Sequence, residues 1–426
     1  MEVTEDGFGA FVGIDWAEAF HAFSVKGVEE AEAQLGEIPH EPEALEIWVN
    51  ELRKRFPKGK IGVCLEQAKG PLMFHLMEYD CFVLYPVNPK SLKCFRESFV
   101  SSGAKDDPGD ADYMRRMIEQ HRDCMRAWEP DDPQTRMIAI LTEDRRKMVS
   151  ERAGLANRLT AALKAYFPQA LEWMGDRIYG PLACDFVSTW ERLDEIKRAR
   201  KKTIRKFYQK HRCRDEELLQ RRIEEIRAAV PLTMDEAIIS TSVLKVRSIV
   251  RQLRVVNQAI REYDEQLEAL FAEHPDADIF DSFPGAGEAL APRLLAAWGS
   301  DRDRHPDARS MQMYSGIAPV TKKSGKKGQQ TPTIHRRYRC PKFLLQTFHE
   351  YARCSLQKSV WAKAYYTMMR DRGKRHHAAL RALAFKWIRI MFRCWQDRCP
   401  YDEIKYLTAL QRTHAPLLQY IAQAQA

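Results

Sequence analysis

The first 130 residues alternate short apolar runs with one amphipathic stretch, the pattern of a mixed α/β domain. Residues 11–14 predict a buried strand that ends at Asp15, and residues 61–65 predict another that ends at Glu66. Apolar alternation at 22–25 predicts a strand paired with the first. Residues 81–87 predict a further strand, ended by proline. Apolar residues at 45, 48, 49 and 52 share one face of a helix expected between the strands at 22–25 and 61–65.

A helical period replaces this pattern from about residue 133 to 270. Spacings of four and three form a heptad seam at Ile249, Leu253, Val256, Ile260, Tyr263, Leu267 and Leu270. A partner stripe on an earlier helix comprises Met148, Leu155, Leu159, Ala162 and Tyr166. The two helices are expected to pack as an antiparallel coiled-coil arm. Such an arm could be an intramolecular hairpin or a dimerisation device, and the seam suits both.

Residues 276–395 predict a separate, mainly helical unit, followed by a helical tail at 396–426. It opens with Phe283-Pro284-Gly285-Ala286-Gly287 and a helix from Ala289 to Trp298, similar to a helix-hairpin-helix turn. Glycines in such a turn let backbone amides approach a phosphate at a helix N-terminus. The alternative is a plain interhelical turn.

The composition excludes several protein classes. The net charge is +9 and the pI about 8.9. The 10 cysteines contain no CxxC pair, which argues against a zinc knuckle or a disulfide framework and favours a reducing compartment. No signal peptide or apolar run of membrane-spanning length is present. A soluble, cytoplasmic protein without a membrane partner is expected.

Two basic regions predict contact with nucleic acid. Residues 197–214 carry ten Lys or Arg and no acid, with Phe207 and Tyr208 among them. No Asp or Glu occurs between Asp307 and Glu350, a window rich in bases. Such density favours a phosphate backbone as partner. For the first region the alternative is a disordered basic linker. The predicted contacts are Lys201, Lys202, Arg205, Lys206, Lys322, Lys323, Lys326, Lys327, Arg336 and Arg337.

Four acids suggest a metal centre. Asp15 and Glu66 follow predicted strands, while Asp107 and Asp110 lie one turn apart at the start of a predicted helix. Carboxylates gathered in this way repel one another unless Mg²⁺ or Mn²⁺ neutralises them, and hard cations prefer oxygen ligands. A hairpin meander followed by βαβα, with acids at strand ends, is the pattern of an RNase H-like (RuvC-like) fold.

These features together resemble a known family. The motifs are GIDxA at Asp15, LExxxG at Glu66, KxDxxDA at Asp107 and Asp110, then PGxG and GxxPxxxxSG in the C-terminal unit. In this order they resemble the IS-one-ten family of insertion-sequence transposases and the related Piv-type DNA invertases. The resemblance covers roughly residues 8–125 and 276–395 and includes a coiled-coil spacer.

The resemblance implies a RuvC-like domain with a DEDD set and a C-terminal transposase domain with a serine nucleophile. Carried over by position, the four acids match the DEDD set and Ser324 matches the nucleophile. Asp106, Asp112, Ser310 and Ser315 fall outside these matches. The expected domains are 1–130, the arm 131–275 with a basic insertion at about 180–235, the transposase domain 276–395 and the tail.

The same resemblance implies a function and its partners. We expect a site-specific recombinase of an insertion sequence that cuts and rejoins DNA through a serine–phosphodiester intermediate, with Mg²⁺ or Mn²⁺ on the acids. The implied partners are donor and target DNA, a structured non-coding guide RNA and further subunits, as a dimer or tetramer. The alternatives are a RuvC-like nuclease that uses the carboxylates alone and a non-catalytic RNA-binding scaffold.

The chain departs from the family pattern at two places. Gln67-Ala68-Lys69-Gly70 stands where a small Ala-Thr-Gly is usual, a change that should spare the metal ligand. Residues 326–333 replace a glycine-rich basic loop, which puts in doubt how closely the backbone near Ser324 approaches DNA. His335 is eleven residues from Ser324, so activation of the serine by a carboxylate-bound metal is expected.

Overall fold

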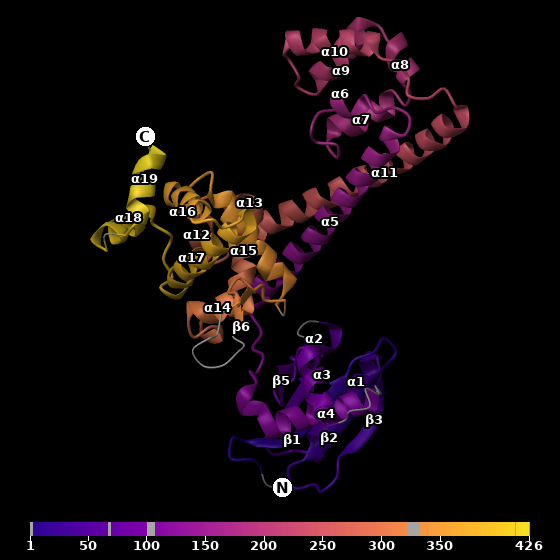
Figure 1. Ribbon diagram of the computed structural model, residues 1–426. Coiled ribbons are helices and arrows are strands. Elements are labelled where there is room, and N and C mark those ends of the chain that lie inside the picture. The colour runs from indigo at the N-terminus through magenta and orange to yellow at the C-terminus, as the bar shows by residue number, and fades with distance from the viewer. Residues whose placement is uncertain are drawn as a thin grey trace. The chain divides into compact units, whose positions relative to one another are not determined.

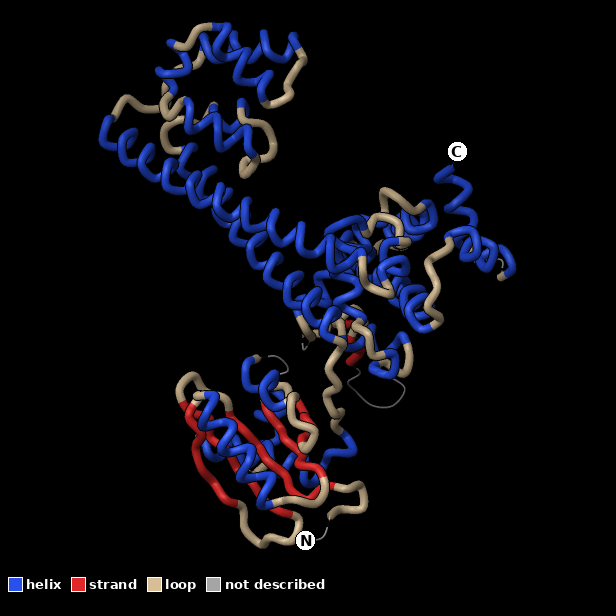
Figure 2. The backbone as a smooth tube through the Cα atoms, turned by 180° about the vertical axis from the view of Figure 1, so that it is seen from behind, coloured by secondary structure: helices blue, strands red, loops and turns tan. Residues whose placement is uncertain are grey.

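The computed structural model describes residues 3–66, 70–99, 107–322, 333–338, 340–413 and 415–425. The chain divides into two compact units, Met1–Pro130 and Asp131–Ala426. The first unit contains a five-stranded sheet, and the second is almost entirely helical (Figures 1 and 2).

The sheet of the N-terminal unit has the strand order β3-β2-β1-β4-β5. β1 (Phe8–Asp15), β2 (Phe20–Gly27) and β3 (Gln34–Pro39) form an antiparallel meander. β4 (Lys60–Leu65) joins β1 in parallel, and β5 (Phe82–Pro86) joins β4 in parallel. The predicted meander and the predicted parallel strands are therefore confirmed.

Helices cover both faces of this sheet. α1 (Pro42–Arg55) and α2 (Pro71–Leu76) pack on one face with alternate residues of β1 and β4, including Val12 and Val63. α3 (Pro89–Glu97) and α4 (Asp107–His121) cover the opposite face, where Phe11 and Cys64 point. Because both faces are buried, β1 and β4 are nearly continuous apolar runs. A short turn, η1 (Arg122–Cys124), follows α4.

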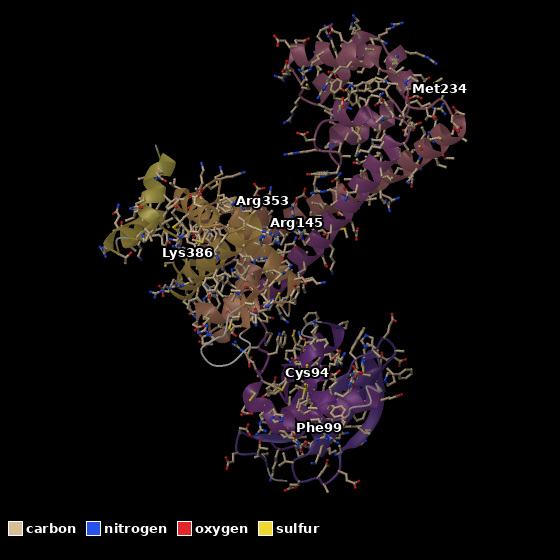
Figure 3. All side chains as sticks on the ribbon, in the orientation of Figure 1. Cys94, Phe99, Arg145, Met234, Arg353 and Lys386 are labelled. Carbon is tan, nitrogen blue, oxygen red and sulfur yellow. The ribbon has the colours of Figure 1, made fainter. Side chains whose placement is uncertain are left out.

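The second unit is built on two long antiparallel helices, α5 (Pro133–Lys164) and α11 (Glu236–Ala272) (Figure 1). Cross-helix contacts fix their register. Arg145, which is labelled in Figure 3, pairs with Asp264, and the amide of Gln134 donates to the carbonyl of Leu270. The predicted seam is buried at Ile249, Leu253, Ile260 and Leu267. An antiparallel pair is thus confirmed, although α5 ends before Tyr166.

A helical head joins the tips of α5 and α11. It comprises α6 (Ala170–Trp173), α7 (Pro181–Thr189), α8 (Leu193–Arg198), α9 (Lys201–Lys210) and α10 (Glu216–Ala228). Its apolar core takes in Leu159 of α5 and Leu253 of α11. Tyr166 belongs to this core and donates its hydroxyl to the carbonyl of Glu191 at 2.8 Å. Residues 197–214 therefore lie in a folded subdomain, and the disordered-linker interpretation is wrong.

The C-terminal helices pack around the base of the two long helices. They are α12 (Ala277–Asp281), α13 (Gly287–Trp298), α14 (Ala308–Tyr314), α15 (Lys342–Ser355), α16 (Val360–Asp371), α17 (His376–Gln396), α18 (Glu403–Arg412) and α19 (Leu417–Gln425), with a turn η2 (Arg302–Arg304). Their core, rich in tryptophan, includes Ile138 of α5 and Leu267 of α11. β6 (Val320–Lys322) and β7 (Thr333–His335) form a small antiparallel pair.

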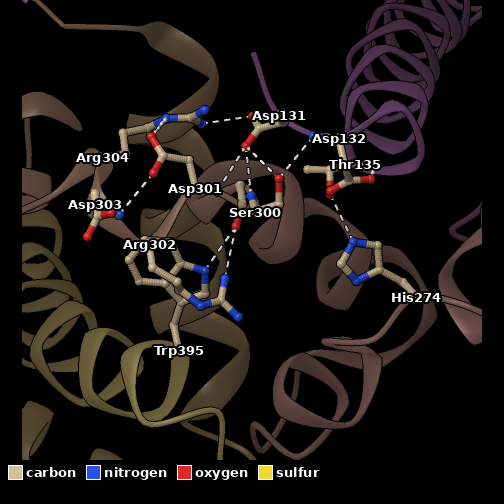
Figure 4. A network of polar contacts seen from close by, with 11 residues as sticks. Asp131, Asp132, Thr135, His274, Ser300, Asp301, Arg302, Asp303, Arg304 and Trp395 are labelled. Atoms are coloured by element: carbon tan, nitrogen blue, oxygen red, sulfur yellow. Dashed lines mark hydrogen bonds and ion pairs between the residues drawn. The ribbon is translucent and has the colours of Figure 1, made fainter. Parts of the chain in front are cut away.

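A polar network fastens the start of α5 to these helices (Figure 4). Asp131 accepts the backbone N–H of Ser300 at 2.7 Å and pairs with Arg304 at 2.8 Å. Nearby, Arg302 pairs with Asp276 at 2.6 Å and lies over the ring of Trp395. Thus the base of the helical pair is anchored by buried or half-buried charges as well as by apolar packing. None of the helices among the described residues is long and apolar enough to cross a bilayer.

Candidate active site and nucleic-acid interfaces

Two of the predicted acids follow adjacent parallel strands. Ile14 of β1 is paired with Leu65 of β4, and Asp15 and Glu66 come next on the two strands. Since parallel strands end at the same edge of a sheet, the two carboxylates emerge at the same edge. The sheet topology therefore brings together residues that are 51 positions apart in the sequence.

α4 brings a third acid to this part of the fold. Gly13 permits a close approach, because a Cβ built there would lie 1.9 Å from the carbonyl oxygen of Ala111. That carbonyl belongs to the residue after Asp110, which is 3% exposed. Asp107 begins the same helix one turn earlier. A larger residue at position 13 would push α4, and Asp110 with it, away from β1.

Arg96 of α3 lies among these acids. Its guanidinium donates to Asp110 Oδ1 at 2.5 Å, and both side chains are largely buried. The hydrogen bond to Asp110 raises the pKa of Arg96, and the charge of Glu66 adds to this effect. Arg96 therefore lies within electrostatic reach of two predicted metal ligands and offsets part of their charge.

The donor set suits a hard cation, because all four predicted ligands are carboxylates. Among the described residues, however, no three Asp, Glu, His or Cys side chains are close enough together to hold a metal ion. A bound cation would have to share the carboxylate of Asp110 with Arg96, which occupies Oδ1. The topology thus places Asp15 and Glu66 at one edge of the sheet and Asp110 on the helix packed against β1, without forming a metal site among the described residues.

Asp112 has a different role from its neighbours. It accepts hydrogen bonds from Arg115 at 2.7 Å and from the hydroxyl of Ser24 at 3.0 Å. Burial opposes ionisation, but the bonds from Arg115 hold the pKa of Asp112 below its ordinary value. Arg115, itself buried, also pairs with Glu119. This network fastens α4 to β2, in agreement with the exclusion of Asp112 from the DEDD set.

Two histidines flank the loop that follows Asp15. The backbone N–H of Ala17 donates to Nδ1 of His21 at 3.3 Å, and Nε2 of His21 lies 2.9 Å from Nδ1 of His40. Burial, together with the charge of His40, lowers the pKa of His21 to about 4. His21 is therefore neutral at physiological pH and supports the loop without adding charge beside Asp15.

The predicted nucleophile and its neighbours lie in the other unit. Ser324, Lys323, Lys326 and Lys327 fall outside the described residues, and Lys322 ends β6. Ser315 is fully buried and donates to the carbonyl of Gln312, so it cannot reach a substrate. Of the remaining predicted contacts, Arg336 is exposed and Arg337 half-buried. Tyr338 beside them is 79% exposed.

Most of the bases at 197–214 lie exposed on the head. Lys201, Lys202 and Lys206 are exposed and have no carboxylate partner within the described chain, whereas Arg205 bonds to Gln220 at 3.1 Å. The two aromatic residues interleaved among these bases belong to the packing of the head. Tyr208 is 0% exposed and donates to the carbonyl of Trp173, while Phe207 packs on Trp190.

The glycines of the PGxG turn have a packing explanation. A Cβ on Gly285 would lie 2.8 Å from the carbonyl oxygen of Cys354, so α15 requires a glycine there. Phe283 and Ala286 are buried in the same core. Only Gly287 faces open space. The turn therefore serves to join α12 and α13 closely against α15, as the plain-turn alternative predicts.

Sequence reasoning missed two groups of charged residues. Arg96 belongs to no motif, and its pairing with Asp110 depends on the packing of α3 against α4. A second basic cluster surrounds the loop between α16 and α17, where Arg370, Arg372, Lys374 and Arg375 are exposed. Its signal was visible in the sequence, because residues 370–381 carry five Lys or Arg and one acid.

Comparison with known proteins agrees with this organisation. Residues 12–168 match the IS110 DEDD family model, described as a transposase, and residues 277–367 match the transposase IS116/IS110/IS902 family. The chain is 28% identical to the mini-circle putative transposase for IS117 of Streptomyces coelicolor, over 98% of this chain and 100% of that protein. It is 26% identical to the insertion element IS110 43.6 kDa protein of the same organism, over 94% and 96% of the two chains.

Both family models describe transposases, and they match this chain in the units that hold the predicted acids and the predicted serine. The relatives match it over nearly its whole length. The chain belongs to the IS116/IS110/IS902 family of insertion-element transposases.

Proposed function

We propose that this transposase is an RNA-guided, site-specific DNA recombinase with an RNase H-like catalytic domain and a serine nucleophile. The observation that carries the proposal is the topology, which places Asp15 and Glu66 at the same end of the β1–β4 pair and Asp110 on the helix packed against β1. Asp110 is held beside the half-buried Arg96, and a charge pair of this kind is costly to maintain for stability alone. The family motif supplies the fourth acid, Asp107.

In the proposed reaction, Oγ of Ser324 attacks a phosphorus atom of the DNA backbone. A bond forms between Oγ and phosphorus while the bond to a deoxyribose oxygen breaks, and that oxygen leaves with a proton. The hydroxyl proton of Ser324 passes to a carboxylate or to water. The phosphoserine link keeps the bond energy, so a second deoxyribose hydroxyl can displace the serine and reseal the strand.

Asp15, Glu66, Asp107 and Asp110 would hold the metal, Mg²⁺ or Mn²⁺. A divalent cation bound there would stabilise the charge that builds on the phosphoryl oxygens. Arg96 donates to Oδ1 of Asp110, so a cation would use Oδ2 of that carboxylate or displace the guanidinium. We propose that the acids of one subunit meet the serine of another in a dimer or tetramer on DNA.

The guide RNA is tested by isolating the protein with whatever nucleic acid it carries. We expect a discrete RNA species to survive DNase treatment and disappear with RNase, because base pairing would supply the sequence specificity. Sequencing the co-purified material decides the matter. Random fragments of genomic DNA or bulk RNA would argue against RNA guidance and favour a nuclease that recognises DNA shape.

The exposed lysines of α9 are proposed to contact the backbone of this nucleic acid. Changing Lys201, Lys202 and Lys206 together to Gln should weaken binding roughly tenfold near physiological salt. The slope of log affinity against log salt for duplex DNA should fall by up to about 2.7, at roughly 0.9 for each phosphate that a lysine no longer neutralises. Fluorescence anisotropy over a salt series measures both quantities.

A matched control removes the same charge elsewhere. The triple variant Lys358→Gln, Lys405→Gln and Arg412→Gln changes exposed bases that are not clustered with other bases in one loop. It should bind nearly as the wild type does. If the α9 variant and this control variant lose equal affinity, the α9 lysines act only through net charge and the proposed contact is wrong.

A further inference from the structure

The loop between α16 and α17 concentrates exposed positive charge, with Asp371 as its one acid and no ion pair to balance it among the described residues. Arg370, Arg372, Lys374 and Arg375 are exposed, as are His376 and His377. None of the four Arg and Lys side chains forms an ion pair with a carboxylate in the described part of the chain. Residues 372–396 contain no Asp or Glu, so α17 also brings no acid to balance them.

Elsewhere in the same unit, several arginines are paired. Arg293 pairs with Glu350 at 2.6 Å, and Arg302 pairs with Asp276 at the same distance. Arg393, near the other end of α17, pairs with Asp397 at 3.4 Å. An ordinary solvated surface mixes charges in this way. Single exposed bases without an ion pair, such as Lys358 and Arg412, also occur among the described residues, but residues 370–377 gather four of them in one loop, which points to an external anion.

The loop has a fixed backbone. Gly373 has a φ of 79°, and its N–H donates to the carbonyl of Arg370 at 2.9 Å. The N–H of Lys374 donates to the carbonyl of Met369 at 3.1 Å. These two bonds make a Schellman motif, in which glycine takes the left-handed conformation. The basic side chains are therefore displayed from a defined turn.

The start of α17 also favours an anion. Arg375 is the N-cap residue and provides no capping hydrogen bond, and the first turn contains no acid. His376 and His377 occupy the first two positions of this 21-residue helix. Cationic groups at a helix N-terminus are disfavoured by the helix dipole, which attracts anions there. An anionic ligand would satisfy both the side chains and the free N–H groups.

Burial and the positive charge nearby lower the pKa of a histidine next to this loop, His349. His349 of α15 lies against His377, with ring centroids 5.4 Å apart. Burial lowers the pKa of His349, and the charges of His377 and Arg381 lower it further. Tyr366 of α16 contacts the start of α17, since its hydroxyl lies 2.7 Å from Nδ1 of His376.

We propose that residues 370–377, with the first turn of α17, form an additional binding surface for the phosphodiester backbone of nucleic acid. The surface begins beyond the segment 277–367 that the transposase family model matches. It rests on the proposed function only in that the ligand is nucleic acid. Evenly spaced phosphates suit four flexible bases on a fixed turn better than a single small anion does.

The test uses the full-length chain with Arg372, Lys374 and Arg375 changed together to Gln. Anisotropy titrations with a fluorescent DNA duplex and with an RNA hairpin of equal length should show affinity about tenfold weaker near physiological salt. The salt slope for the DNA duplex should fall by up to about 2.7. If the variant binds just one of the two probes more weakly, that nucleic acid is the ligand of the loop. If it binds both more weakly, the loop contacts the backbone of DNA and RNA alike.

The control variant of Lys358, Lys405 and Arg412 should keep its affinity for both probes. If the triple loop variant does not fold, as judged by thermal melting, the double variant Arg372→Gln, Arg375→Gln should give about two thirds of the slope change. Unchanged affinity and slope for both probes in a folded variant overturn the proposal. Such a result does not bear on the proposed recombinase reaction, because that reaction is tested separately, by measuring strand exchange with the variant Ser324→Ala.

Discussion

Replacing Ser324 by Ala is expected to abolish strand exchange while leaving nucleic-acid binding near the wild-type level. The hydroxyl is the proposed nucleophile, so its removal takes away the covalent route altogether. We expect recombination to fall by at least about 10³-fold, the scale typical for loss of a nucleophile. Protein–DNA adducts trapped by denaturation and resolved on gels should disappear at the same time.

Ser315→Ala is the matched control for this change. Ser315 is fully buried nine residues upstream and donates only to the carbonyl of Gln312. Its loss should lower stability modestly and leave adduct formation in place. A different outcome would identify the chain as a RuvC-like nuclease that uses its carboxylates alone. In that case the Ser324 variant would still cut DNA in a metal-dependent way, and the wild type would form no adducts.

Asp15→Asn is expected to eliminate strand cutting and to weaken Mn²⁺ binding. The amide keeps the shape of the side chain at the end of β1 but loses the charge that would hold a divalent cation. A loss of about 10³-fold or more in cutting is expected. Isothermal titration with Mn²⁺ provides a second readout, and chelation of the metal in the wild type should reproduce the loss of cutting.

The control for Asp15 is Asp112→Asn, an acid that belongs to the packing of α4. This variant weakens the bonds to Arg115 and Ser24, so its melting temperature should fall. Mn²⁺ affinity should stay within a few-fold of the wild type. Intact cutting by the Asp15 variant would instead favour the view of the chain as a non-catalytic RNA-binding scaffold.

Periodicity in the sequence was sufficient to predict the main elements of the fold. β1 and β4 are buried on both faces and stand out as apolar runs. The long helices display their seam because the same face is buried for many turns, as at Leu253 and Leu267. β3 gave no such signal. It is an edge strand whose residues are mostly exposed, so its sequence Gln34–Pro39 shows no apolar run.

The candidate site was harder to predict, because side-chain partners depend on packing between elements. Asp15 and Glu66 could be paired from strand order alone, and the register of β1 with β4 agrees with that expectation. Arg96 could not be paired with Asp110, since nothing local links positions 14 apart. The position of Ser324 relative to the acids stays a prediction.

The basic segment at 197–214 shows a different limit. Its charge density indicates exposed bases, as the structure shows, but the two aromatic residues among them, Phe207 and Tyr208, pack against the core of the head. Ile204 and Tyr208 are four apart and lie on the buried face of α9. Helical spacing, applied to residues 197–214 as it was to the long helices, would have assigned Ile204 and Tyr208 to the core.

The two long helices also set a minimum size for any ligand that engages both ends of the second unit. Ile138 lies in the C-terminal core and Leu163 in the head core, 25 residues apart on one unbroken helix, which is about 38 Å. At about 3.4 Å per base pair, bridging that span takes a duplex of roughly one full turn. A duplex shorter than this span can contact only one end of the second unit. The measured affinity should therefore rise abruptly once the duplex is long enough to contact both ends.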